Sequence, residues 1–282
     1  MNTDQKRQRG RPRGFSSNPE SNRIQSLDRA LNILRVLADG EGLSLTEVAE
    51  ASGQAPATTY RVLTTFQLHQ MVEFQKDRQL WHVGPEAFRI GSAFLKRTDI
   101  VERARPVMRE LMLETGETAN LAIADGAEVV FLSQVESHEH IRAFFRPGTR
   151  GPIHASGIGK ALMAYFPDAM VERMLSRHGL EAFTGKTLIR RDDLLRDLAA
   201  IRQRGWSIDD EERTSGMRCI AAPIFNAYGE AVAGISISGP TVRLPDAGST
   251  RLGQLVLAAA DRITAASGGQ RPNSCPNGPA LA

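Results

Sequence analysis

The sequence predicts an α+β protein in two parts, and the periodicity of its apolar residues is the main evidence. As far as about residue 67, and again from 84 to 115, apolar residues recur mostly at helical spacing. From residue 118 onward, strand-like runs alternate with helical ones. The 282 residues and the hydrophobic fraction of 41% allow two packed domains. No run of about 18 apolar residues occurs, so no membrane contact is expected.

The segment from Ser44 to Leu63 predicts two short helices joined by a tight turn. Ser44 precedes Glu47 by three residues, which is the spacing of a capping box at the start of a helix. Gly53 suits a sharp turn because it carries no Cβ, and Pro56 suits the first position of a second helix. The pattern is typical of a helix-turn-helix, and the alternative is an ordinary helical hairpin packed in a core.

The flanking segments extend this motif to a winged helix over residues 24–83. Residues 24–38 predict a helix that packs across the pair, with an apolar stripe of Leu27, Ala30, Leu31, Leu34 and Leu37. Residues 71–83 alternate apolar and polar positions on both sides of Lys76 and Asp77. This alternation predicts a β-hairpin with its turn at the charged pair.

In a helix-turn-helix, the first residues of the second helix face the base edges of double-stranded DNA. The candidates here are Ala57, Thr58, Thr59 and Arg61, to which the hairpin turn adds Lys76 and Arg78. Arg61 suits either a guanine or a phosphate. The two cations of the turn fit a solvated surface equally well.

The first 23 residues carry a second signal for nucleic acid. Arg9, Arg11 and Arg13 alternate with Gly10 and Pro12 in a segment that resembles an AT-hook, which lies extended in a narrow minor groove. This tail, predicted to be disordered, has a net charge of +4, whereas residues 24–83 contain five basic and seven acidic side chains. The tail is therefore expected to supply much of the attraction to DNA, unless it only solubilises the terminus.

The remaining elements follow from the same patterns. Residues 84–98 predict a linker helix, which either dimerises or packs on its own domain. Residues 99–267 predict the second domain, whose first helix Asp99 would cap. Strands are expected at 118–124, 128–136, 140–146, 206–209, 219–224 and 231–237, and helices at 156–165, 168–178, 191–204 and 245–266. Residues 268–282 are expected to be disordered.

Two features of the sequence predict a cytoplasmic protein. The N-terminus has no apolar segment of the kind found in a secretory signal. The two cysteines are Cys219 and Cys275, and the second falls in a terminal segment rich in Pro, Gly and Asn. No structural disulfide is therefore expected.

Three motifs of the second domain resemble the IclR family of bacterial transcription regulators. They are PIHASGIGKALMA at 152–164, RQRGWSIDDEE at 202–212 and GMRCIAAPIFN at 216–226, and the resemblance covers about residues 24–266. It implies a GAF-like α+β effector-binding domain for a small organic acid, and a dimer or tetramer on palindromic operators. The patterns HASGxGKAL, GxxCIA and SISGP, with the basic RGRP-type N-terminus, are most similar to the glyoxylate-responsive regulators of allantoin use.

The resemblance also implies the lining of the effector pocket: Ser156, Gly157, Ile158, Asp209, Cys219, Ser236, Ile237 and Ser238. Hydrated glyoxylate presents a carboxylate and a gem-diol. Free N–H groups at the start of a helix suit the carboxylate, and Asp209 suits the diol while repelling a second carboxylate. Each residue also has a plain structural alternative, such as an N-cap for Ser156 and a core thiol for Cys219.

Enzymatic motifs are incomplete. Gly159 and Lys160 resemble the end of a P-loop, but His154 replaces its first glycine and Ala161 replaces the residue that would bind magnesium. Neither S-x-x-K nor G-x-S-x-G spacing occurs. Cys219 as a nucleophile would have only His154 as a candidate base.

The sequence thus predicts a homo-oligomeric, sequence-specific DNA-binding regulator that is switched by a small 2-oxo acid, glyoxylate in the first place. No catalytic residue, cofactor or metal is expected. One alternative is an enzyme acting on a small organic acid, with the helix-turn-helix as an assembly module. Another is a metal sensor that uses His138 and His140 with Glu136, an incomplete set for zinc.

Overall fold

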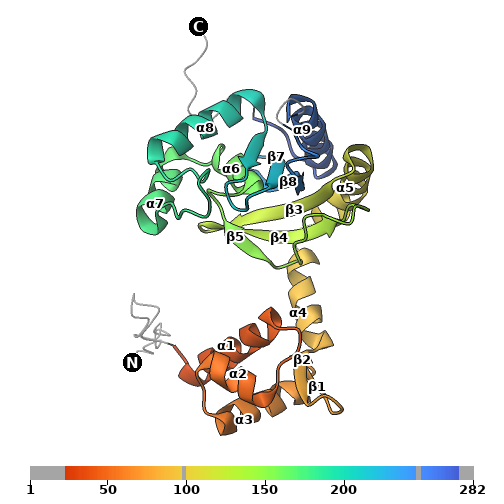
Figure 1. Ribbon diagram of the computed structural model, residues 1–282, viewed down its shortest axis with the longest axis vertical. Coiled ribbons are helices and arrows are strands. Elements are labelled where there is room, and N and C mark those ends of the chain that lie inside the picture. The colour runs from red at the N-terminus through yellow and green to blue at the C-terminus, as the bar shows by residue number, and fades with distance from the viewer. Residues whose placement is uncertain (1–22, 97–99, 246–248, 273–282) are drawn as a thin grey trace, which may run out of the picture. The chain divides into compact units, whose positions relative to one another are not determined.

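The computed structural model describes residues 23–96, 100–245 and 249–272, and the chain divides into two compact units between Phe94 and Leu95 (Figure 1). Arg9, Arg11, Arg13 and Asp99 lie outside the described residues. Within the described ranges, no helix is both long enough and apolar enough to cross a membrane.

The N-terminal unit is a winged helix-turn-helix. Its elements are α1 (Gln25–Asp39), α2 (Leu45–Ser52), α3 (Pro56–Leu68), β1 (Val72–Gln75), β2 (Leu80–Val83) and α4 (Pro85–Lys96). The antiparallel strands β1 and β2 form the predicted hairpin. Leu43 and Trp81 exchange backbone hydrogen bonds of 3.1 and 2.8 Å, which tie the segment before α2 to the hairpin.

Local signals in the sequence account for the helix-turn-helix. The N–H of Glu47 donates to Ser44 Oγ at 3.4 Å, and the N–H of Ser44 donates to Glu47 Oε2 at 2.8 Å, so the capping box is present. Gly53 ends α2 in the left-handed conformation, with φ of 65°, and Pro56 opens α3. These three predictions are confirmed.

The core of this unit differs in part from the predicted stripe. Ile33 and Leu37 of α1 are buried with Leu63 and Trp81, whereas Leu27 is 55% exposed. The apolar stripe of α1 therefore contributes to this core mainly in its second half.

The C-terminal unit is a six-stranded antiparallel sheet with helices on both faces. Its elements are α5 (Ile100–Thr115), β3 (Thr118–Asp125), β4 (Glu128–Val135), β5 (Arg150–Pro152), α6 (Gly157–Met163), α7 (Asp168–His178), α8 (Arg191–Arg204), β6 (Ser207–Asp210), β7 (Met217–Phe225), β8 (Ala231–Pro240) and α9 (Ser249–Ala266). The strand order is β5-β4-β3-β8-β7-β6. In Figure 1, α5 and α9 lie together at one side of this unit, and α6, α7 and α8 at the other.

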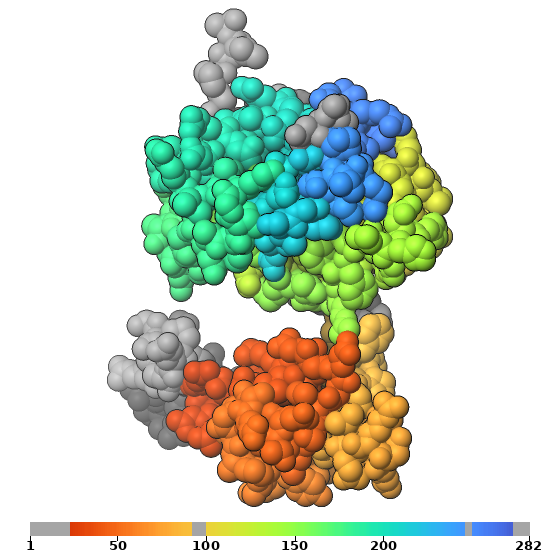
Figure 2. All heavy atoms as spheres, viewed as in Figure 1, coloured from red at the N-terminus to blue at the C-terminus, as the bar shows by residue number. Residues whose placement is uncertain are grey.

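Each face of the sheet has its own apolar core. Met108 of α5 and Val256 of α9 pack with Ile237 on one face, and Ile158 of α6 and Leu198 of α8 pack on the other. Successive side chains of a strand point to opposite faces, so each strand serves both cores. The side chains fill the spaces between the ribbons (Figure 2).

Two expectations for this unit are corrected. Residues 140–146, all described, form no strand, and the chain instead returns to the sheet at the short strand β5, which the sequence did not predict. Residues 268–272 are held in place rather than disordered, because the N–H of Gln270 donates to Asn226 O at 3.1 Å and Arg271 pairs with Asp261 at 2.9 Å. The predicted strand at 140–146 is wrong because an alternating pattern contains no information about a pairing partner.

Candidate functional site

The start of α3 exposes part of the predicted DNA-contacting set. Ala57 and Arg61 are exposed, and Thr58 is half-buried. Thr59 is fully buried, and its hydroxyl donates to Ala55 O at 3.2 Å. The prediction that Thr59 faces DNA is therefore wrong, because at 3.6 residues per turn it shares the inner face of α3 with the buried Leu63.

Two further side chains belong to the exposed surface of this unit. Tyr60 has the spacing of a core position, yet it is 53% exposed. Arg29 of α1 lines a groove with Arg61 of α3, so two cations lie on this surface. Arg29 was not predicted from the sequence, because only α3 is expected to enter a DNA groove.

The hairpin turn presents its cations to solvent. Lys76 and Arg78 are both exposed, with Asp77 between them. Gln79 adopts a positive φ of 57° and donates to Lys76 O at 2.8 Å, which closes the turn. This geometry fits both predicted roles, a phosphate contact and a solvated turn.

A small cavity of about 40 Å³ lies between the start of α6 and strands β6, β7 and β8. Seven of the eight predicted effector residues line it: Ser156, Gly157, Ile158, Asp209, Cys219, Ser236 and Ser238. This volume accommodates a few groups of the size of water. The structure therefore brings these residues together around a space for a very small ligand.

The register of the sheet assembles the polar side of the cavity. Asp209 pairs with Cys219 across β6 and β7, and Cys219 pairs with Ser238 across β7 and β8. Directly paired residues point to the same face, so the three side chains form a row across three strands. Ile237 points to the other face and packs in the core below α5 and α9, so its side chain does not line the cavity.

A hydrogen-bonded chain orients the two serines. Asn120 of β3 is fully buried, and its Nδ2 donates to Ser236 Oγ at 3.4 Å and to Ser238 Oγ at 3.2 Å. Gln134 Nε2 in turn donates to Asn120 Oδ1 at 2.8 Å. Each serine oxygen therefore accepts from the amide, and the hydroxyls of both serines also hydrogen-bond with the Cys219 side chain. The sequence did not predict this role for Asn120.

Burial controls the protonation of the acid and the thiol. Burial raises the pKa of Asp209 to about 6, although Glu212 N donates to its Oδ1 at 2.8 Å and Lys160 lies nearby. Burial, with the adjacent Asp209 charge, raises the pKa of Cys219 to about 11. Cys219 is thus a neutral thiol at pH 7, which is unsuited to the role of a nucleophile.

A buried charge cluster lies behind the cavity. Lys160 of α6 is 1% exposed and donates to Asp197 of α8 at 2.7 Å and to Glu212. Burial raises the pKa of Glu212 to about 7 despite the Lys160 charge. Lys160 thus connects α6, α8 and the segment after β6, a role distinct from the P-loop lysine considered above.

Two arginines that the sequence did not predict also line the cavity. Arg150 pairs with Asp125 at 2.6 Å and with Glu128 at 2.7 Å, and these two hydrogen-bonded carboxylates raise the pKa of its guanidinium. Arg213 has a buried Nη1 that makes no hydrogen bond to any other described residue. Both side chains come from segments outside the motifs, so their position depends on the fold.

Two aromatic rings close the apolar side of the cavity. Phe131 of β4 and Phe145 stack with their centroids 4.4 Å apart, and both line the cavity. Phe145 belongs to the segment that was expected to be a strand and is a loop instead. The correction of that segment therefore adds an aromatic ring to the site.

Glu136, one of the residues proposed for a metal sensor, has another partner. Glu136 Oε2 accepts from Arg142 Nε at 2.9 Å. Among the residues that the structure describes, no group of three or more His, Cys, Asp or Glu side chains is arranged to hold a metal ion.

A winged helix-turn-helix in one unit and a cavity for a small ligand in the other define the class of DNA-binding regulators. Comparisons with known proteins agree. The family of bacterial transcriptional regulator IclR C-terminal domains matches residues 92–265, and the IclR helix-turn-helix domain matches residues 26–76. The chain belongs to the IclR family and is a DNA-binding transcriptional regulator, not an enzyme.

Individual relatives are similar over almost their whole length. The HTH-type transcriptional regulator BhcR of Paracoccus denitrificans (strain Pd 1222) is 53% identical over 92% of this chain and 94% of its own. The HTH-type transcriptional repressor AllR of Escherichia coli (strain K12) is 36% identical over 93% and 97%. The crystal structure of the Thermotoga maritima IclR superposes with a TM-score of 0.74 at 28% identity, covering 87% of this chain and all of that one.

Proposed function

We propose that the small cavity of the C-terminal unit binds glyoxylate or a similar 2-oxo acid, and that this binding changes the affinity of the chain for its operator. The observation that carries the proposal is the row of Asp209, Cys219 and Ser238 around a cavity of about 40 Å³. An acid of two or three carbon atoms fits such a volume, and a bulky acid does not.

The chemistry of the lining fits the two ends of hydrated glyoxylate. In the first turn of α6, the N–H of Gly159 donates to Ser156 Oγ at 3.3 Å and that of Gly157 to Cys219, so the N–H of Ile158, with Arg213 nearby, is left for the carboxylate. Asp209 would accept from the gem-diol, and the hydroxyls of Ser236 and Ser238, which hydrogen-bond with Cys219 without a ligand, would donate to the diol oxygens instead. Asp209 disfavours a second carboxylate at that end.

The DNA-binding part of the proposal rests on exposed residues of α3 and the hairpin. Ala57, Thr58 and Arg61 would contact the operator, and Lys76 and Arg78 would lie near phosphates. The Arg9, Arg11 and Arg13 segment would add electrostatic attraction. Because one such unit has no basic surplus, we propose a dimer or tetramer that engages two half-sites.

The test measures binding of promoter DNA upstream of the gene for this chain, with and without glyoxylate, by a gel shift. Ligand and DNA affinities must change by the same factor, since coupling between two binding equilibria is reciprocal. A thermal-shift panel of glyoxylate, pyruvate, glycolate and allantoate on the free protein ranks the ligands, because a ligand that binds the native state raises the melting temperature.

Ser238→Ala removes one donor to the ligand and is expected to abolish most of the glyoxylate shift. Ser133→Ala is the matched control, because Ser133 is also a buried serine of the sheet but does not line the cavity. The proposal would be contradicted if glyoxylate raised the melting temperature of Ser238→Ala as much as that of the wild type. It would also be contradicted if none of the four acids changed the affinity for DNA.

A further inference from the structure

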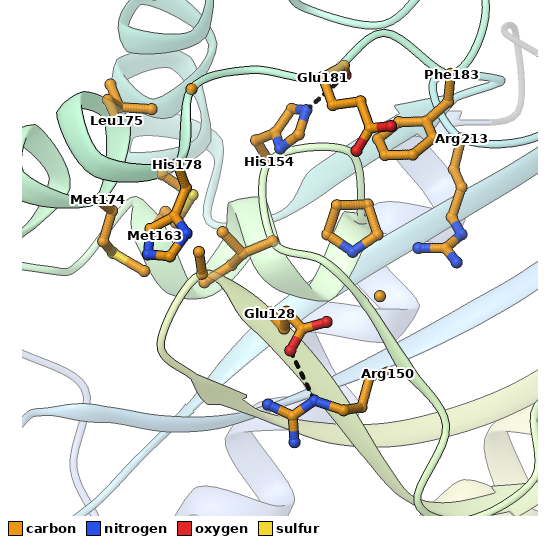
Figure 3. Close-up of a pocket in the computed structure, with 15 residues that line it drawn as sticks. Glu128, Arg150, His154, Met163, Met174, Leu175, His178, Glu181, Phe183 and Arg213 are labelled. Atoms are coloured by element: carbon orange, nitrogen blue, oxygen red, sulfur yellow. Dashed lines mark hydrogen bonds and ion pairs between the residues drawn. The ribbon is translucent and has the colours of Figure 1, made fainter. Parts of the chain in front are cut away.

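A second, larger cavity of about 400 Å³ lies beside the effector cavity, between β5, the end of α7 and the loop at 179–183 (Figure 3). None of the eight predicted effector residues lines it. Its volume falls in the range of about 300–1,000 Å³ that is typical of ligand pockets. The size and position of this cavity set it apart from the site discussed above.

The two ends of the larger cavity differ in chemistry. Met163, Met174 and Leu175 form an apolar end at one side of Figure 3, and Arg150 and Arg213 lie at the other. Met163 is fully buried and Met174 is 9% exposed. Methionine side chains adapt to ligands of different shapes, so this end suits an apolar group.

Arg213 is the cation that this cavity leaves available. Arg150 already pairs with Asp125 and Glu128. Arg213 forms no ion pair within 4.0 Å among the described residues, although its charge acts on the nearby Asp209, and its Nη1 is buried without a hydrogen bond. Its guanidinium lies 5.9 Å from the ring centre of Phe183. A buried guanidinium N–H without an acceptor is costly, so a carboxylate placed there gains a charge-assisted hydrogen bond.

Of the other titratable side chains of the lining, Glu128 is already paired with Arg150 at 2.7 Å, and the rest do not oppose an anion strongly. His154 Nε2 contacts the backbone oxygen of Glu181 at 3.0 Å, which fixes its ring. The Glu181 side chain is exposed, so water and salt screen its charge. His178, at the end of α7, is exposed at the rim.

We propose that the larger cavity is a second ligand site for a monocarboxylate with an apolar body, whose carboxylate pairs with Arg213 while its body lies against Met163, Met174 and Leu175. Both cavities are lined by Arg150, Gly151 and Arg213, so the Arg213 guanidinium would border both ligands. Competition between the two ligands for Arg213 would make their binding antagonistic; this last step alone rests on the proposed effector function.

The test uses isothermal titration of the full-length protein with 3-phenylpropionate, hexanoate and benzoate, and with the uncharged 3-phenylpropionamide. We expect at least one of the acids to bind and the amide to bind at least about tenfold more weakly, since about 1.4 kcal/mol separates a tenfold change in affinity. No binding by any of the three acids, or equal binding of the amide, overturns the proposal.

Two variants locate the binding. Arg213→Gln removes the cation and His178→Trp fills the rim, and each is expected to weaken acid binding about tenfold or more. The control for Arg213→Gln is Arg190→Gln, because Arg190 is 76% exposed and lies outside both cavities. The control for His178→Trp is Arg177→Trp, because Arg177 neighbours His178 on α7 but does not line the cavity. Wild-type affinity in Arg213→Gln and His178→Trp would place the ligand elsewhere and overturn the proposal.

The outcome is separable from that of the effector proposal. Titration with these acids needs neither glyoxylate nor DNA. Ser238→Ala is expected to retain 3-phenylpropionate binding, and His178→Trp is expected to retain the glyoxylate shift, since each residue lines only one of the two cavities. Loss of acid binding in Ser238→Ala would show that the acid occupies the small cavity, against the proposal.

Discussion

Gly157 and Cys219 approach so closely that a Cβ on Gly157 would lie 2.7 Å from Cys219 Sγ. The same Cβ would lie 3.4 Å from the Cβ of Ala221. The start of α6 therefore rests on β7 at a distance that requires a glycine. We expect Gly157→Ala to lower the free energy of unfolding by about 1–3 kcal/mol through overpacking, and to abolish the thermal shift by glyoxylate.

The control and the rescue of this variant use neighbouring positions. Gly185→Ala has open space around its new Cβ and should leave both measurements unchanged. Cys219→Ala combined with Gly157→Ala removes the clash, so urea denaturation should show partial recovery of stability, which a double-mutant cycle quantifies. Full stability of the single variant Gly157→Ala would contradict the close approach.

Lys160 is itself buried and pairs with two carboxylates, of which Glu212 is buried and Asp197 is 21% exposed. We expect Lys160→Met to lower the free energy of unfolding by about 3–5 kcal/mol, because Glu212 would lose its cation in a buried region and Asp197 would keep only Arg204 at 3.3 Å. Urea denaturation measures the change. Lys186→Met is the comparison: Lys186 also pairs with two carboxylates, but it is 52% exposed, so its loss should lower the free energy of unfolding far less.

The raised pKa of Asp209 predicts a pH-dependent stability. Between its ordinary pKa of 3.8 and its folded value of about 6, the folded state binds more protons than the unfolded state. Stability from this group therefore falls as pH rises through that window. Asp209→Asn removes the effect, so relative to wild type it should gain about 1–3 kcal/mol between pH 4 and pH 7.5. Asp192→Asn, at a side chain 75% exposed, should show no comparable gain.

Arg61 is the exposed cation at the start of α3, and Arg61→Ala should weaken operator binding by about 1–3 kcal/mol. Fluorescence anisotropy at several salt concentrations measures it. A lower salt slope would assign Arg61 to a phosphate, and altered preference at one base pair would assign it to a base. Thr59→Val, at a buried hydroxyl, should change neither quantity, and equal losses in the two variants would contradict this account of α3.

The N-terminal arginines are expected to determine much of the salt dependence. A chain that begins at Ile24 lacks a segment of net charge +4 and should bind its operator more weakly. The slope of log affinity against log salt should also flatten, because fewer counterions are released. Equal slopes for the full and shortened chains would show that Arg9, Arg11 and Arg13 do not contact DNA.

The parts of the fold that the sequence predicted correctly depend on local chemistry. The backbone requirements at the ends of α2 and at the start of α3 are met by nearby residues: Ser44 and Glu47 cap α2, Gly53 takes the left-handed conformation that ends it, and Pro56 opens α3. Their spacing alone therefore locates two helices and a turn. The helices α7 and α8 were predicted to the residue for a similar reason, since apolar periodicity and end signals coincide.

The features that the sequence did not predict depend on distant partners. Which face Thr59 and Ile237 occupy is decided by the elements packed against them, and no window of sequence contains those elements. Lys160 becomes buried only because Asp197 and Glu212 arrive from 37 and 52 residues away. Arg213 reaches the cavities from an irregular segment, where pattern analysis is least informative.

The two-faced sheet separates two kinds of change in this chain. The side chains of Asp209, Cys219 and Ser238 point to one face of the sheet. Ile220, which follows Cys219 on β7, and Ile237, which precedes Ser238 on β8, belong to the core on the other face. Substitutions in the polar row would alter ligand chemistry without touching that second core. Close relatives built on this sheet can thus diverge in the molecule they sense while retaining the packing that keeps them folded.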